Sequence, residues 1–105
     1  MIHVLLACAA GLSTNIMKKK VEESAKAEQI DISVKAVGLE EIQSHLEGCD
    51  VVLLGPQIRY QMEEIREVID RCSPKTKLMC IDAADFGMMR GEIVLQKMMN
   101  LLGLY

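Results

Sequence analysis

Short apolar runs alternate with longer helical patterns along this chain, and this alternation constrains its fold more than any other feature. The runs over residues 2–7, 51–54 and 78–81 are almost unbroken, as in strands of a parallel sheet that helices cover on both faces. The run over residues 30–37 instead alternates apolar and polar side chains, which is typical of a strand at the edge of a sheet. The sequence therefore predicts four strands, with the second at an edge.

Helical spacing of apolar residues fills the segments between and after these runs. The clearest stripe has spacings of four, three, four and three residues and consists of Ile58, Met62, Ile65, Ile69 and Cys72. The other predicted helices lie over residues 14–28, 39–46 and from 91 onward. The order β-α-β-α-β-α-β-α predicts an α/β fold with a parallel sheet and right-handed crossovers. With the second strand at an edge, we expect the strand order 2-1-3-4 and three layers, with helices on both faces of the sheet.

Length and composition narrow the class of protein. The 105 residues suit a single domain over residues 1–105, and the net charge of −3 with three aromatic residues does not favour a surface for nucleic acid. No apolar stretch approaches the roughly 20 residues that span a bilayer, and the first residues lack the features of a signal peptide. A cytoplasmic protein with no direct insertion into the membrane is the expectation.

The four cysteines are not arranged as a metal site. They stand at positions 8, 49, 72 and 80 without a Cys-x-x-Cys pair, and neither histidine lies near a cysteine pair. We therefore expect no bound metal. Cys49, Cys72 and Cys80 fall at a strand start, on a helical stripe and within a strand, so they are interpreted as structural thiols.

Cys8 has a different setting, because it follows the central strand. In sheets of this order ligands bind beyond the carboxyl ends of the strands where the order reverses, here between the first and third strands. The loops over residues 8–14, 55–60 and 82–90 are expected to meet there. Cys8 thus begins one of the three loops that surround the predicted site.

The loop from Cys8 to Thr14 has the composition of an anion-binding turn. Its small residues let the backbone curl so that successive N–H groups point inward, and the helix that follows adds positive potential. This setting favours the thiolate, which is the nucleophilic form of cysteine. We therefore expect Cys8 to accept a phosphoryl group. The residues expected to hold the phosphate are Ala9, Ala10, Gly11, Leu12, Ser13 and Thr14.

Two roles stay open for the hydroxyl residues at the end of this loop. Ser13 or Thr14 could cap the first helix, although no Glu or Gln follows three residues later to complete a capping box. Their hydroxyls could equally bind the phosphate.

Two segments give the chain a family resemblance. The run Leu5-Leu6-Ala7-Cys8-Ala9-Ala10-Gly11-Leu12-Ser13-Thr14 resembles the phosphocysteine loop of enzyme IIB components of the bacterial sugar phosphotransferase system, in the lactose/cellobiose/chitobiose class. The run Asp50-Val51-Val52-Leu53-Leu54-Gly55-Pro56-Gln57-Ile58, with Tyr60 following, is similar to the second signature of that family. Length and element order agree as well, so the resemblance covers the whole chain.

The resemblance implies a phosphoryl relay. A phosphohistidine on enzyme IIA would give its phosphoryl group to Cys8, and the phosphocysteine would give it to a sugar bound by the membrane component IIC. The sugar implied is cellobiose, chitobiose, lactose or a related disaccharide, and no cofactor is implied. The protein would be cytoplasmic and would reach the inner face of the membrane through IIC. Ala9 and Leu12 depart from the serine and methionine common in the family, but backbone donors do not depend on those side chains.

The partner surface is expected to surround Cys8. Leu12 and the loops over residues 55–60 and 82–90 would form an apolar collar with a few polar groups, which would exclude water during transfer between two proteins. The candidate interface residues are Gly55, Pro56, Gln57, Tyr60, Asp82 and Phe86.

The main alternative is a low-molecular-weight tyrosine phosphatase or an arsenate reductase, whose fold is similar. Those enzymes carry a Cys-x5-Arg loop in which the arginine binds the phosphate in a bidentate manner. Six residues after Cys8 this chain has Thr14, which does not favour hydrolysis. Asp82 and Asp85 could act as general acids in a phosphatase, and the competing interpretation is loop solvation or helix capping.

Overall fold

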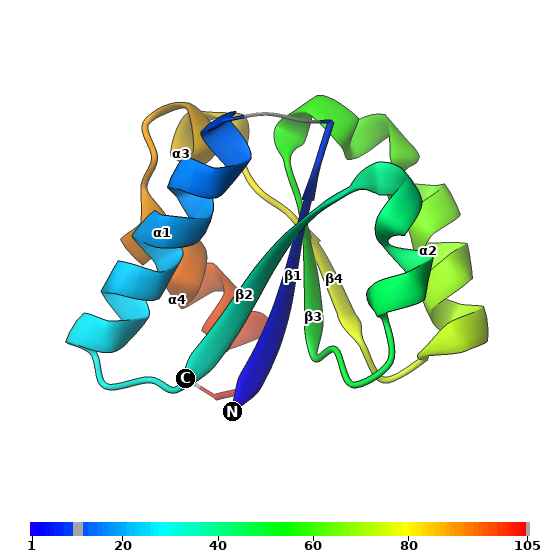
Figure 1. Ribbon diagram of the computed structural model, residues 1–105, viewed down its shortest axis with the longest axis horizontal. Helices are drawn as coiled ribbons and strands as arrows, with labels where there is room; N and C mark the ends of the chain where they lie inside the picture. Colours follow the sequence, from blue (N-terminus) through cyan, green and yellow to red (C-terminus); the bar gives the residue numbers. More distant parts are fainter. Residues whose placement is uncertain (10–11, 105) are drawn as a thin grey trace.

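The computed structural model describes residues 1–9 and 12–104 and contains a four-stranded parallel sheet in the order β2-β1-β3-β4 (Figure 1). The strands are β1 (Ile2–Cys8), β2 (Ile32–Gly38), β3 (Val51–Leu54) and β4 (Lys77–Cys80). The predicted strand order and parallel pairing are confirmed, and β2, the strand with alternating polarity, lies at the edge.

The register of the sheet places the ends of β1 and β3 side by side. Ala7 pairs with Val37 of β2 and with Leu54 of β3, so Cys8 is the next residue along the central strand. Just beyond β3, the Gly55 N–H donates to the Ala7 carbonyl at 2.8 Å and continues the pairing by one residue. Cys8 and Gly55 therefore leave the sheet at the same edge.

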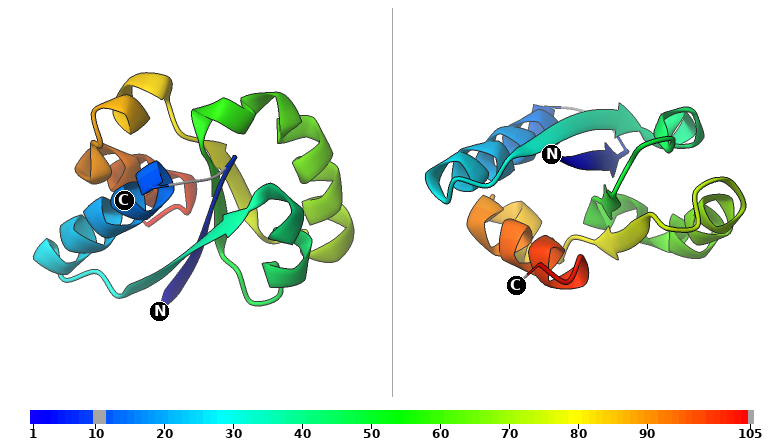
Figure 2. Two further views of the ribbon diagram at one scale, coloured as in Figure 1. Left: turned by 45° about the horizontal axis from the view of Figure 1, so that its top comes forward. Right: turned by 90° about the horizontal axis from the view of Figure 1, so that it is seen from below.

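Helical segments cover both faces of the sheet, which gives the predicted three layers (Figure 2). On one face lie α1 (Leu12–Ala27), α3 (Ala83–Gly87) and α4 (Gly91–Leu101). On the other lie α2 (Met62–Cys72) and the 3₁₀ helices η1 (Leu39–Glu41), η2 (Gln43–His45) and η3 (Pro56–Gln61). No helix in the described part of the chain is long and apolar enough to cross a membrane.

Because successive strand residues face opposite sides, β1 contributes to two separate cores. Val4, Leu6 and Cys8 pack in the core beneath α1 and α4, whereas Leu5 and Ala7 pack in the core beneath α2. The carboxyl end of β1 therefore presents the Cys8 side chain to the α1 side of the sheet.

The segment over residues 39–46 differs from the single α-helix that was predicted. It forms η1 and η2, in which the Ile42 and His45 N–H groups bond to carbonyls three residues earlier. The Ser44 hydroxyl donates to the Glu41 carbonyl at 2.9 Å, and side chains that bond to nearby backbone in this way compete with α-helical hydrogen bonds. Buried Ile42 and Leu46 anchor the segment to the sheet, and Leu39 packs against the same core.

The predicted stripe from Ile58 to Cys72 is also divided. Ile58 has φ −114° and ψ 21°, so it lies in a kink within η3, and the α-helix begins only at Met62. The stripe was wrong at its other end, because Ile69 is buried but Cys72 is exposed. In the loop over residues 82–90 the structure has the short helix α3, whose five residues are too few to show a helical period.

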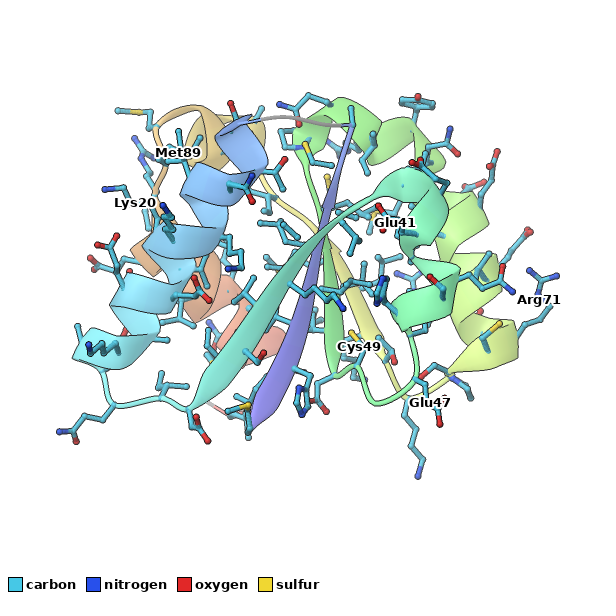
Figure 3. All side chains as sticks on the ribbon, viewed as in Figure 1. Lys20, Glu41, Glu47, Cys49, Arg71 and Met89 are labelled. Atoms are coloured by element: carbon cyan, nitrogen blue, oxygen red, sulfur yellow. The ribbon has the colours of Figure 1, made fainter. Side chains whose placement is uncertain are left out.

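One glycine sets the distance between α1 and α4. A β carbon at Gly91 would lie 2.5 Å from the backbone carbonyl carbon of Lys20 and 2.6 Å from its oxygen. A backbone atom cannot rotate away, so only glycine lets the first turn of α4 come this close to the middle of α1. Lys20 and the neighbouring Met89 are labelled in Figure 3.

Candidate functional site

Cys8 is buried at the end of the central strand, with 3% of its surface exposed. Its thiol donates a hydrogen bond to Gln57 Oε1, with 3.1 Å between Sγ and the oxygen. The two residues are 49 positions apart and come from the loops after β1 and β3. The predicted convergence of these loops is thus present as a direct contact between side chains.

Gly55 makes the contact between Cys8 and Gln57 sterically feasible. A β carbon on residue 55 would lie 2.6 Å from Cys8 Sγ and 2.8 Å from Gln57 Oε1. Both distances are shorter than real β carbons adopt, so any side chain here would displace both groups. The φ of −63° at Gly55 is one that any residue adopts. The glycine is therefore needed for the close approach and not for its backbone conformation.

The residues after Gly55 hold Gln57 in place. Pro56 occupies the first position of η3, where its missing N–H costs nothing and its fixed φ favours a helical start. Ile58 is buried in the core beneath α2 and anchors the turn. Gln57 lies between these two residues and is itself exposed, apart from its contact with the thiol.

Thr14 lies in the first turn of α1 and is only 5% exposed. Among the described residues its Oγ1 has no hydrogen-bond partner, although the atom is fully buried. A buried hydroxyl without a partner costs about 1–3 kcal/mol, which is a reason to expect a ligand atom there. Ser13 is exposed and makes no capping bond in the described part of the chain.

The rest of the loop is described only in part. Ala9 is exposed and α1 begins at Leu12, with no acidic residue in its first turn. The predictions for Ala10 and Gly11, and for the side chain of Leu12, lie outside the described residues.

The two aspartates of the third loop have structural contacts. Asp82 Oδ1 accepts the Ala84 N–H at 2.9 Å, so Asp82 caps α3. Asp85 is 4% exposed, and its Oδ2 accepts from Lys97 Nζ at 2.7 Å. Arg90 Nη1 lies 3.5 Å from the other oxygen of Asp85. Loop solvation is therefore wrong for Asp85, because the carboxylate is buried and paired.

The charge state of Asp85 follows from these contacts. The hydrogen bond from Lys97 lowers the pKa of the Asp85 carboxyl below its usual range, and the same contact raises the pKa of Lys97. A carboxylate held ionised in this way does not suit a general acid.

The remaining interface candidates lie at different depths. Tyr60 is 77% exposed, while Pro56 is half-buried. Phe86 is 3% exposed and packs in the core beneath α1 and α4. The prediction that its side chain belongs to the contact surface is therefore wrong. The five residues of α3 are too few to show a periodic pattern, so the sequence did not indicate which side of this helix faces inward.

The contact between Gln57 and the thiol was missed in the sequence, which offered Gln57 only as an interface residue. The sole signal was the expectation that its loop and the Cys8 loop share one edge of the sheet. The contact depends on the length of the glutamine side chain and on the space above Gly55. Neither of these can be recognised from the spacing of residues in the sequence.

Cys49 and Cys72 lie away from this site, whereas Cys80 pairs with Leu54 at the same edge of the sheet. Burial raises the pKa of Cys49 and, separately, that of Cys80. A cavity of about 440 Å³ lies toward the amino end of β1, where Glu47 and Cys49 border it (Figure 3). The described residues contain no group of three or more side chains that could hold a metal ion.

Comparisons with known proteins match the chain along almost its whole length. Residues 3–97 match the family described as "PTS system, Lactose/Cellobiose specific IIB subunit". A galactose-specific EIIB component from Lactococcus lactis subsp. cremoris is 33% identical, and 94% of each chain is covered. A cellobiose-specific EIIB component from Lactococcus lactis subsp. lactis is also 33% identical, again with 94% of each chain covered.

A solved structure agrees with these sequence matches. The solution structure of a cellobiose-specific phosphotransferase IIB component from Borrelia burgdorferi superposes with a TM-score of 0.77 at 32% identity. The match covers 97% of this chain and 92% of that one. The fold is the phosphatase-like one that IIB domains have.

Proposed function

Because this chain belongs to the lactose/cellobiose-specific IIB family of the phosphotransferase system, we propose that Cys8 is the residue that carries its phosphoryl group. IIB components are phosphotransferases that carry phosphoryl groups in sugar transport, and they work with IIA and IIC partners. Our proposal concerns four points for this chain: which residue carries the phosphoryl group, how that group is held, which partners the chain has, and which sugar it serves.

The position of Cys8 is the single observation that carries the proposal. Cys8 is the last residue of the central strand, at the point where the strand order reverses, and α1 follows it in the chain. This is where an α/β sheet binds ligands, and a helix N-terminus favours a bound anion. Cys49 and Cys72 lie elsewhere, and Cys80 pairs with Leu54 on the neighbouring strand rather than ending the central one. Burial raises the pKa of Cys49 and of Cys80.

The proposed transfer balances without any added reagent. The N–P bond of a phosphohistidine on IIA breaks as the S–P bond to Cys8 forms, and the thiol proton ends on the imidazole nitrogen that leaves. In the second step the S–P bond breaks as a sugar hydroxyl oxygen on IIC takes the phosphoryl group. The hydroxyl proton then restores the Cys8 thiol, so each cycle returns the protein to its starting state.

Backbone groups and one hydroxyl are proposed to hold the phosphoryl group. The donors are the N–H groups from Ala9 to Thr14 together with the Thr14 hydroxyl. Support comes from the buried Oγ1 of Thr14, which has no partner among the described residues, and from the first turn of α1, which has no acidic residue to repel a phosphate.

The partner surface is proposed to surround Cys8 on the rim formed by Pro56, Gln57, Tyr60 and Asp82, with the buried Gly55 beneath it. Tyr60 supports this choice, because a tyrosine that is 77% exposed is a common anchor in interfaces. We place the protein in the cytoplasm as a single IIB domain over residues 1–105, at the membrane only through IIC.

The sugar is proposed only as a class. The two relatives named for galactose and for cellobiose are equally similar to this chain, at 33% identity each. IIC would bind the sugar, so this chain carries little information about it. We propose a disaccharide such as cellobiose, chitobiose or lactose, which is the class that the family resemblance implies.

Mass spectrometry of the intact chain after incubation with a phosphorylated IIA tests the carrier role. The expected result is one added phosphoryl group, which Cys8→Ser abolishes. Cys49→Ser, Cys72→Ser and Cys80→Ser are matched controls that should each keep the modification. No added group, or one that survives in Cys8→Ser, would refute the proposal.

A further inference from the structure

We propose that Gln57 presents opposite ends of its side-chain amide to Cys8 in the two states of the carrier. Oε1 accepts the thiol proton before transfer, and Nε2 donates to the phosphoryl group after it. This role rests on the proposed function of Cys8, and it makes Gln57 a positioning residue for both states.

The resting state is the one in the structure. Cys8 Sγ donates to Gln57 Oε1, with 3.1 Å between the two atoms. This bond fixes where the proton lies and therefore directs a lone pair of Sγ away from Gln57. The acceptor is a neutral amide, so it orients the thiol without competing strongly for the proton.

The phosphorylated state requires the opposite polarity. Once the S–P bond has formed, the sulfur carries no proton and the phosphoryl oxygens accept hydrogen bonds. An amide oxygen that stayed in place would face other acceptors. The amide NH₂ of glutamine supplies two donors and occupies nearly the same volume, so a half-turn of the terminal bond restores a favourable contact.

Gln57 is placed so that this half-turn is cheap. Pro56 fixes the backbone before it, and buried Ile58 anchors the backbone after it. The side chain itself is exposed and, within residues 1–9 and 12–104, makes no other hydrogen bond. The turn therefore breaks one hydrogen bond and disturbs no packing.

Gly55 keeps the amide close during both states. A β carbon there would lie 2.8 Å from Oε1 and would push the amide off the thiol in either orientation. The absence of a side chain at residue 55 thus leaves room for the planar amide of Gln57 beside the thiol.

Two substitutions separate the roles of the oxygen and the nitrogen. Gln57→Glu keeps an acceptor, but its carboxylate offers no donor and repels a phosphoryl group. Gln57→Met keeps the length and volume without either hydrogen bond. Gln61→Glu makes the same charge change at the other end of η3 and serves as the control.

Initial rates of phosphorylation by phosphorylated IIA, over a range of IIA concentrations, give the first readout. We expect Gln57→Glu to lower the maximal rate by about tenfold or more, and Gln57→Met by a smaller factor. The maximal rate is the decisive quantity, because Gln57 also lies on the proposed partner rim and its substitution can change the half-saturating IIA concentration as well. Gln61→Glu should stay within about twofold of the parent protein.

The side-chain amide of Gln57 gives a second readout that needs no variant to react. In ¹⁵N–¹H spectra its NH₂ signals, assigned by their loss in Gln57→Met, should move when Cys8 is phosphorylated. Gln61 signals should move less.

The outcomes distinguish this inference from the function beneath it. A wild-type chain that IIA does not phosphorylate on Cys8 would overturn the carrier role and this inference together. A phosphorylated wild-type chain with unmoved Gln57 signals would overturn the role of Gln57 alone. Equal maximal rates for Gln57→Glu and Gln61→Glu, or a change only in half-saturation, would do the same, since the latter indicates docking.

Discussion

The thiol of Cys8 occupies the space in which a side chain of residue 55 would begin, at the carboxyl ends of the paired strands β1 and β3. A β carbon on residue 55 would lie 2.6 Å from Sγ. The two residues are 47 positions apart in the chain, and the parallel register of Ala7 with Leu54 brings them together.

Gly55→Ala should therefore impair transfer to Cys8. The added methyl group would displace both Sγ and Gln57 Oε1, and we expect a loss of about tenfold or more in the rate of phosphorylation. Mass spectrometry at timed intervals measures this rate. Gly87→Ala is the matched control, because a β carbon there meets nothing within 4 Å. Equal rates for the two variants would contradict the steric argument.

Thr14→Val should separate stability from phosphate binding. The valine has the shape of threonine without the hydroxyl, so removing a buried oxygen that has no partner among the described residues should leave the resting protein as stable or up to about 1 kcal/mol more stable. Urea unfolding measures this difference.

The same variant should form less phosphocysteine, because the phosphoryl group would lose a donor. Ser13→Ala, a change at an exposed neighbour, should have a smaller effect. A marked loss of stability in Thr14→Val would instead mean that the hydroxyl already has a partner in the resting protein.

The contact between Asp85 and Lys97 should make stability depend on acid pH. Because the pKa of Asp85 is lower in the folded protein than its ordinary value of 3.8, the stabilisation is complete above that value. It is lost as the pH falls through the folded pKa, where the carboxylate takes up a proton. Urea midpoints from neutral pH to about pH 3 measure the effect.

Asp85→Asn should lower the urea midpoint at neutral pH and weaken this acid dependence. Asp70→Asn, at an exposed aspartate of α2, is the control and should keep both. An unchanged acid dependence in Asp85→Asn would show that other carboxylates cause it.

The thiols should differ in their reaction with iodoacetamide. Cys72 is exposed and should be alkylated before Cys49 and Cys80 near neutral pH. Burial raises the pKa of Cys49 and that of Cys80 above the ordinary value of a thiol, so both should react slowly near neutral pH. Peptide mapping by mass spectrometry identifies the labelled residues. Early labelling of Cys49 or Cys80 at neutral pH would contradict the burial seen in the structure.

Hydrolysis of p-nitrophenyl phosphate should be negligible for this chain. Thr14 stands where a phosphatase loop has its arginine, and losing one strong donor to the transition state commonly costs about 10²–10³ in rate. Asp85 is ionised and paired with Lys97, so it does not supply a proton to a leaving group. Turnover that Cys8→Ser abolishes would instead support a phosphatase.

The sheet could be predicted because its signals are local. The alternation over residues 30–37 identified β2 as an edge strand, and the unbroken runs identified the other three strands, although one of them, β4, lies at the opposite edge. Helix type over residues 39–46 depended on the Ser44 hydroxyl bond to the backbone, which competes with the periodic pattern. Contacts between separate loops, such as Cys8 with Gln57 and Asp85 with Lys97, depend on side-chain reach and turn geometry, which spacing does not encode.

The close packing at Gly91 has a consequence for the distant cysteine loop. The contact with Lys20 fixes α1 near its middle, and a rigid helix carries its first turn with it when it moves. Any side chain at residue 91 would push α1 outward and shift its first turn, where some of the proposed phosphate donors lie, although residue 91 is not itself one of them. Fine adjustment of an anion site can therefore arise from the spacing between two helices, at a residue that a search around the reactive atom would overlook.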